Sequence, residues 1–143
     1  MNLFLANLIV SANLIANRFR KAAQMFGFLT KTRPARINPS EAVARVKAGT
    51  LTLIDVREAG ELRQTGKARG ALHIPLGQIN AQTDPENGHF NRKLDTGKAV
   101  ALYCASGARS GRAADVMRAN GFTEVYNLGT LHDWQLSGGA MVR

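Results

Sequence analysis

The sequence predicts an α/β domain built on a parallel sheet. Two short, unbroken apolar runs, TLTLIDV at 50–56 and KAVALYC at 98–104, are typical of strands that are buried on both faces. Segments with helix-start and helix-stop signals lie between such runs, so strands and helices alternate along the chain. This alternation indicates a central parallel sheet flanked by helices.

The first helix of the domain is expected to begin after Asn38. Asn38 can cap its N-terminus, Pro39 suits the first helical position, and Glu41 is placed to reach back in a capping box. Gly49 suits the end of this helix. A strand and then a second, short helix are expected to follow, and Gly66 suits the end of that helix.

The rest of the domain predicts further strands, a loop and a longer helix. In chain order these are a strand at 71–76, a mainly polar loop with room for a short helix at 80–97, the strand at 98–104, a helix at 109–120 and a strand at 124–129 that completes the sheet. The longer helix carries its apolar positions at Ala113, Val116 and Met117, and Gly121 suits its end.

The net charge of the chain is unevenly distributed. The 143 residues fit one domain, and a hydrophobic fraction of 45% allows a real core. The formal net charge is +9, but residues 1–38 hold six of the 19 basic residues and no acidic one. Residues 39–143 therefore carry 13 basic against 10 acidic groups, without a basic stripe interleaved with aromatic residues. We expect no nucleic-acid partner.

The basic N-terminal region, residues 1–37, predicts an amphipathic helix and a linker, ahead of a domain at 38–143. Phe4, Leu8, Ile15 and Phe19 fall on one helical face. Asparagines interrupt the apolar run, so it is not read as a spanning helix of roughly 20 apolar residues. Packing on its own domain, a dimer seam, a membrane surface and an organelle transit peptide all remain open uses of residues 1–30.

Cys104 is the only cysteine of the chain. It cannot form an internal disulfide, so nothing requires an oxidising compartment, and a cytoplasmic location is expected. The three histidines, His73, His89 and His132, lie far apart, and no Cys-x-x-Cys pair is present. We therefore expect neither a metal site nor a cofactor.

The position of Cys104 predicts a nucleophilic sulfur in an anion-binding loop. It ends a predicted strand and precedes a predicted helix, where backbone N–H groups and the helix dipole converge and lower a thiol pKa. Gly107 can adopt a positive φ, and Arg109 adds a second positive charge. The alternative is a buried, inert cysteine, which would more often lie in the middle of a strand. No second cysteine is available, so another molecule must relieve any persulfide formed here.

Four segments in order resemble the rhodanese (thiosulfate sulfurtransferase) family. They are LIDVRE (Leu53–Glu58) with Glu61, GALHIPL (Gly70–Leu76), YCASGARS (Tyr103–Ser110) and VYNLGTLHDW (Val125–Trp134). Each segment is weak evidence alone, but four in the family's order are specific. The resemblance covers about residues 38–143 and implies a three-layer rhodanese domain.

The resemblance also implies a reaction and a set of site residues. Cys104 would take a sulfane sulfur from thiosulfate or a similar donor as a persulfide, and pass it to cyanide, a thiol or an acceptor protein. The cradle residues would be Ala105, Ser106, Gly107, Ala108 and Arg109. Arg109 would orient the sulfonate, while Asp55, Arg57 and Ser110 would support the site.

The chain departs from the family pattern at two places. Lys67 stands where a histidine is common, and Thr130 and Leu131 stand in the place of a glycine-rich turn. These positions belong to the scaffold and the rim, so they concern the choice of acceptor more than the chemistry.

Two other functions remain open at this point. Cysteine phosphatases and arsenate reductases of related fold have a loop one residue longer than the four residues between Cys104 and Arg109. A shorter loop suits sulfur transfer better than a bulky phosphoester. A rhodanese-like regulatory or sulfur-sensing module is the second alternative, although many such modules lack the cysteine.

Overall fold

The computed structural model describes residues 15, 18 and 35–143. The chain divides into two compact units, Met1–Thr32 and Arg33–Arg143. The amphipathic helix expected within residues 1–37 lies almost entirely outside the described residues. Among the residues that are described, no helix is both long and apolar enough to span a membrane.

The described domain is centred on a five-stranded sheet in the order β1-β6-β5-β2-β4, and every neighbouring pair is parallel. The strands are β1 (Ala35–Arg36), β2 (Leu51–Asp55), β4 (Leu72–His73), β5 (Ala99–Cys104) and β6 (Val125–Thr130). Three predicted strands are thus confirmed, and the one expected at 71–76 is shorter. β1 comes from the expected linker and forms the edge beside β6, so the last predicted strand is an inner one.

The helices are α2 (Pro39–Lys47), α3 (Ala59–Thr65), α4 (Leu76–Thr83), α5 (Ala108–Ala119) and α6 (Leu131–Leu136). Helices α2, α3 and α5 begin and end close to their predicted signals, whereas α4 begins at the end of the run predicted as a strand. Asn38 caps α2 through its Oδ1, which accepts from the Ser40 N–H at 2.9 Å. The capping box expected with Glu41 is wrong, because that carboxylate lies 3.7 Å from Arg45, one turn further along.

Two short segments had no counterpart in the predicted elements. Helix α6 follows β6 directly, with a capping box between Thr130 and Asp133. A small antiparallel ribbon pairs β3 (Lys67–Ala68) with β7 (Met141–Val142). This pairing joins the C-terminal segment to the residues that follow α3.

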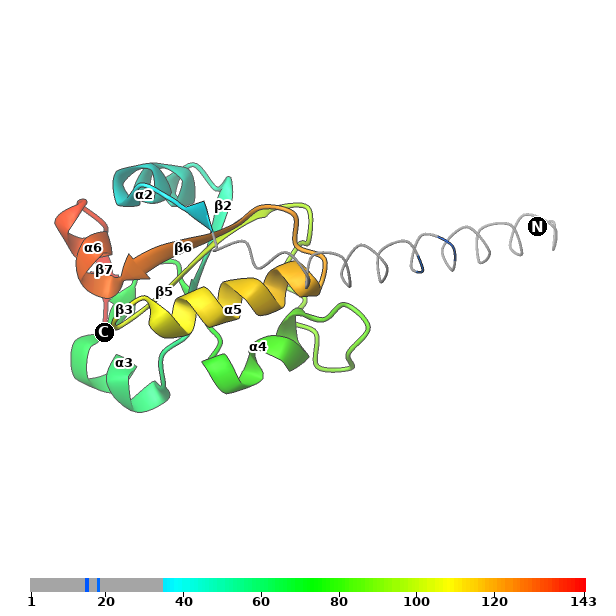
Figure 1. Cartoon of the computed structure of the whole chain (residues 1–143). Coiled ribbons are helices and arrows are strands. Elements are labelled where there is room, and N and C mark those ends of the chain that lie inside the picture. The colour runs from blue at the N-terminus through cyan, green and yellow to red at the C-terminus, as the bar shows by residue number, and fades with distance from the viewer. Residues whose placement is uncertain (1–14, 16–17, 19–34) are drawn as a thin grey trace. The chain divides into compact units, whose positions relative to one another are not determined.

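The core lies in two layers, one on each face of the sheet. Figure 1 shows α4 and α5 on one face and α2 on the other, which confirms the three-layer prediction. All six residues of β5 are buried, and they alternate between the faces. Leu102 and Cys104 pack into the layer with α5, whereas Ala101 and Tyr103 face the layer with α2 and α6.

Gly139 is required by the indole ring of Trp134. The Gly139 N–H donates to the Trp134 carbonyl at 2.9 Å, and a Cβ at Gly139 would overlap the ring. We expect Gly139→Ala to lower the free energy of unfolding, measured in urea, by about 1–3 kcal/mol through overpacking. The control is Gly77→Ala in α4, where a Cβ would meet no atom within 4 Å. It should leave stability unchanged or raise it by up to about 1 kcal/mol. Equal effects of the two substitutions would contradict the steric argument.

Candidate active site

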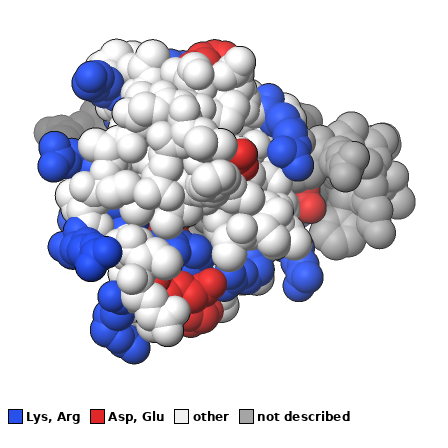
Figure 2. Space-filling view, turned by 90° about the vertical axis from the view of Figure 1, so that its left-hand side faces the viewer, with Lys and Arg blue, Asp and Glu red and all other residues white. Residues whose placement is uncertain are grey.

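The candidate site lies at the carboxyl edge of the sheet, where β2, β5 and β6 end. Cys104 is the last residue of β5, and α5 begins four residues later at Ala108. In the pairing of β5 with β6, Cys104 lies opposite Thr130. Figure 2, which faces this end of the molecule, shows basic side chains around the rim and mainly uncharged groups at the centre. The predicted location of the cysteine is confirmed.

The loop after Cys104 turns its hydrogen-bond donors onto the sulfur. The Gly107 N–H donates to Sγ at 2.9 Å, and the Ser110 hydroxyl lies 3.5 Å from the same atom. Gly107 has a φ of +88°, the left-handed conformation that only glycine adopts without strain. Its predicted backbone role is therefore confirmed.

The pKa of Cys104 reflects two opposing effects. Burial of the side chain raises the pKa, but hydrogen bonds from Ser110, Ser106 and Gly107 outweigh it and lower the pKa from 9.0 to about 7. A substantial fraction of the sulfur is thus thiolate near neutral pH. Cys104 is fully buried, at 0% exposed, so the alternative of a buried cysteine is correct about position. The surroundings differ from those of an inert core cysteine, because a sulfur surrounded only by apolar groups would have a raised pKa.

The covering loop itself is small and largely exposed. Ala105, Ser106 and Ala108 are exposed, and Gly107 is half-buried. The sulfur is therefore separated from solvent mainly by a short stretch of backbone with small side chains.

Asn127 in β6 holds the loop in place, and the sequence analysis did not identify it. Its Nδ2 donates to the Gly107 carbonyl at 2.9 Å, and its Oδ1 accepts from the Gly129 N–H at 3.0 Å. The Ser110 hydroxyl lies 2.8 Å from the same Oδ1. Since this hydroxyl has one proton, the shorter distance favours donation to Asn127, and rotation can redirect the proton to the thiolate at Sγ. The only signal in the sequence was a polar residue inside an apolar strand.

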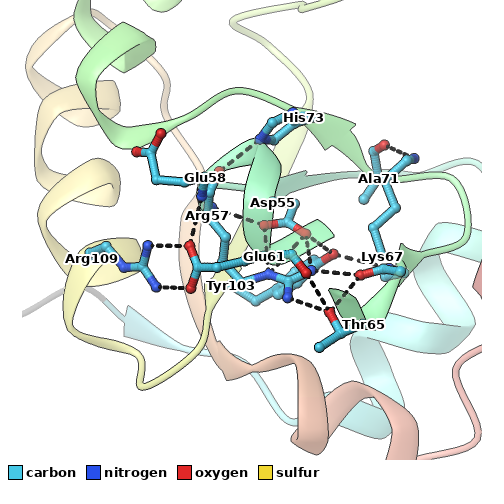
Figure 3. A network of polar contacts seen from close by, with 12 residues as sticks. Asp55, Arg57, Glu58, Glu61, Thr65, Lys67, Ala71, His73, Tyr103 and Arg109 are labelled. Atoms are coloured by element: carbon cyan, nitrogen blue, oxygen red, sulfur yellow. Dashed lines mark hydrogen bonds and ion pairs between the residues drawn. The ribbon is translucent and has the colours of Figure 1, made fainter. Parts of the chain in front are cut away.

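Arg109 is not a free guanidinium. Its two terminal nitrogens donate to the two carboxylate oxygens of Glu61 in α3 at 2.7 and 2.8 Å (Figure 3). This bidentate pair lowers the pKa of Glu61 to about 2, so the carboxylate stays charged at any ordinary pH. The loop donors are the main cause of the thiol's lowered pKa, and the Arg109 guanidinium interacts with the Cys104 thiolate as well. Arg109 therefore adds a positive charge at the site as expected, but Glu61 is paired with that charge.

Asp55 and Arg57, which were expected to support the site, form an ion pair on the opposite face of the sheet from Cys104. Arg57 Nη2 lies 2.8 Å from Asp55 Oδ2, and their side chains are 3% and 0% exposed. Tyr103, the neighbour of Cys104, donates its hydroxyl to the same Asp55 oxygen at 2.6 Å. Arg57 also donates to Thr65 Oγ1 and to the Gly66 carbonyl, both at 2.8 Å (Figure 3). The pair thus ties β2 and β5 to the end of α3.

Comparison with known proteins identifies the family. The model of the rhodanese-like domain matches residues 38–137. The chain belongs to the rhodanese-like family. Its fold agrees, since the human single-domain sulfurtransferase TSTD1 superimposes with a TM-score of 0.62 at 23% identity, covering 71% of this chain and 95% of that one.

Two relatives illustrate how far the similarity of this rhodanese domain extends. An uncharacterized protein of Bacillus subtilis, YqhL, is 45% identical over 76 residues, which are 53% of this chain and 53% of that protein. The thiosulfate sulfurtransferase PspE of Escherichia coli is 31% identical over 80 residues, which are 56% of this chain and 70% of that protein. The chain thus spans about half the length of the Bacillus relative.

The two departures from the family pattern have structural partners in this rhodanese domain. Lys67 Nζ donates to the Ala71 carbonyl at 2.6 Å and closes the turn between β3 and β4. Thr130 Oγ1 accepts from the Asp133 N–H at 3.0 Å and caps α6. Both side chains bind their own scaffold, as expected for positions in the scaffold and the rim.

Proposed function

We propose that this rhodanese domain is a sulfurtransferase that carries a sulfane sulfur as a Cys104 persulfide. The observation that carries the proposal is the sulfur's position at the end of β5, with the Gly107 N–H at 2.9 Å and a pKa of about 7. Such a sulfur is a nucleophile at neutral pH, held by donors that also suit a negatively charged product. Membership of a family that includes thiosulfate sulfurtransferases supports the same reaction.

The reaction has two balanced halves. The Cys104 thiolate attacks the outer sulfur of thiosulfate or a similar donor, and the sulfur–sulfur bond of the donor breaks. Its electron pair leaves with sulfite, and Cys104 then carries a persulfide whose outer sulfur is anionic. In the second half an acceptor such as cyanide attacks the outer sulfur, leaves as thiocyanate and restores the thiolate. A thiol or an acceptor protein takes the same place in the cell.

The cradle assigned to Ala105–Arg109 supports the persulfide through its backbone. The outer sulfur must lie beyond Sγ, next to the loop whose amides already face the thiolate. Ala105, Ser106 and Ala108 place no bulky side chain in the way. Ser110 can follow the charge, because its hydroxyl lies within reach of both Sγ and Asn127.

Phosphatase or arsenate reductase chemistry is less well supported by the same geometry. A phosphate cradle of this type needs the loop arginine to face the bound oxyanion. In this chain both terminal nitrogens of Arg109 donate to Glu61. The structure therefore supports sulfur transfer over phosphoryl transfer.

Mass spectrometry of the intact protein tests the proposed function. After incubation with thiosulfate, we expect the mass to increase by one sulfur atom, and cyanide should remove that increase. Cys104→Ser should show no increase, while Ser106→Cys in the Cys104→Ser background controls for nonspecific sulfuration of any thiol at this loop. A wild-type protein that gains no sulfur from thiosulfate or from a persulfide donor would refute the proposal.

A further inference from the structure

We propose that Glu61 selects the sulfur donor, by holding Arg109 in an ion pair and so withholding a positive charge from strongly anionic donors. The inference rests on the proposed function and narrows its donor class. The preferred donors are sulfane compounds of low negative charge, and a dianion such as thiosulfate is a poor substrate.

The ion pair is anchored on both sides, so it is not a chance surface contact. Arg109 lies in the first turn of α5, and Glu61 lies in α3, 48 residues away in sequence. Glu61 Oε2 also accepts from the Glu58 N–H at 2.8 Å, so a backbone group holds the carboxylate where Arg109 meets it. The side chains of Arg109 and Glu61 are 28% and 33% exposed, so both are accessible to solvent.

The charge of Arg109 is balanced by this arrangement. Arg109 faces Glu61 directly and also lies in the fields of the Cys104 thiolate and of Glu58. Asp55 neutralises Arg57, and the guanidinium of Arg36 lies beside Gly129, which packs against Gly107. The donors that directly contact the Cys104 sulfur are neutral groups. Neutral dipoles hold one negative charge well, but a dianion gains much less than it would from an unpaired guanidinium.

The electrostatic argument gives a quantitative expectation. Removing the Glu61 charge leaves Arg109 with an uncompensated positive charge, and its attraction for a ligand scales with the ligand charge. The factor by which affinity rises should therefore be, for a dianion, about the square of the factor for a monoanion of similar shape. At low ionic strength we expect affinity to rise about tenfold for the dianion and about threefold for the monoanion.

The test uses the full-length protein, Glu61→Gln, and two donors that differ in charge. Thiosulfate is a dianion, and methanethiosulfonate is a monoanion that delivers its outer sulfur with methanesulfinate as the leaving group. Glutamine keeps an oxygen for the Glu58 N–H, and thermal unfolding checks that the variant is folded. We expect KM to fall about tenfold for thiosulfate and about threefold for methanethiosulfonate. Equal changes for the two donors, or a rise in KM for thiosulfate, would overturn the proposal.

Two matched variants separate charge selection from a general effect on the loop. Glu58→Gln removes one carboxylate nearby that does not touch Arg109 and should change the thiosulfate KM by less than about twofold. Adding Arg109→Gln to Glu61→Gln should abolish the gain, because the gain acts through that guanidinium. A gain that survives the loss of Arg109 would assign the effect to another cause.

A binding measurement without turnover distinguishes this inference from the proposed function. In the Cys104→Ser background, calorimetry with sulfate and methanesulfonate measures the same contrast between a dianion and a monoanion. If Glu61→Gln raises the affinity for sulfate more than the affinity for methanesulfonate, charge selection is supported even if no donor forms a persulfide. Persulfide formation with no gain for either dianion overturns the inference and leaves the sulfurtransferase proposal intact.

Discussion

Replacing Arg57 by alanine is expected to lower the free energy of unfolding by about 3–5 kcal/mol. The substitution leaves the Asp55 carboxylate, 0% exposed, without its counter-ion inside the domain. The Tyr103 hydroxyl still donates to Asp55 at 2.6 Å, but one neutral donor does not replace a bidentate guanidinium. The hydrogen bonds to Thr65 and to the Gly66 carbonyl are lost together with the ion pair.

Urea denaturation measures this effect, and a surface ion pair provides the control. Arg118 and Asp115 lie 3.9 Å apart at 28% and 62% exposure. Asp115→Asn should change stability by less than about 0.5 kcal/mol, because exposed pairs contribute little. A loss below about 1 kcal/mol for Arg57→Ala would mean that the buried network contributes no more than a surface pair does. In that case its role as the link between β2, β5 and α3 would be disproved.

Replacing Asn127 by aspartate is expected to reduce sulfur transfer at pH 7 by about tenfold. The new carboxylate faces the Gly107 carbonyl, where Nδ2 now donates at 2.9 Å, and lies one hydroxyl away from Sγ. A negative charge there disfavours the thiolate and raises the pKa of Cys104 above about 7. The thiolate fraction at neutral pH falls accordingly, and the rate falls with it.

The pH dependence distinguishes this mechanism from simple misfolding. Activity of the wild type should rise with pH through a midpoint near 7, since only the thiolate reacts. In Asn127→Asp the midpoint should move to higher pH, and most of the activity should return there. Asn87→Asp, in the loop that leads to β5, adds the same charge and keeps the oxygen that accepts from the His89 N–H at 2.9 Å. Asn87→Asp should leave the midpoint of the pH profile in place. An unchanged midpoint in Asn127→Asp would contradict the role of Asn127 in setting the pKa of Cys104.

The same lowered pKa couples the site to stability. A thiol that ionises more easily in the folded state favours folding above its unfolded pKa. That contribution is lost as the pH falls through about 7. We therefore expect Cys104→Ser to remove a small rise in stability between neutral and alkaline pH.

Elements with local signals could be predicted from the sequence. Asn38 and Pro39 define the start of α2, and the apolar run of β5 ends at Cys104 as predicted. Gly107 has the positive φ that the loop was expected to need. These features depend on residues a few positions apart, so hydrophobic periodicity, caps and glycine conformations suffice to infer them.

Elements without local signals could not be predicted in the same way. β1 consists of two exposed residues, Ala35 and Arg36, that became a strand only because β6 offers an unpaired edge. Helix α4 begins at Leu76, inside a run predicted as strand, because the register of β4 with β2 ends at His73. In both cases a neighbouring strand, not the local composition, decided the conformation.

The sequence by itself determined the position of Cys104, the strand that it ends and the loop that supplies its donors. Only the tertiary structure decided how that loop is held and which of its charges is free. Ser110 meets Asn127 across 17 residues, and Arg109 meets Glu61 across 48. Such contacts exist only after β5, β6 and α3 are brought together at one edge of the sheet. A charge that is unpaired in the sequence can therefore be neutralised in the fold, as Arg109 is by Glu61.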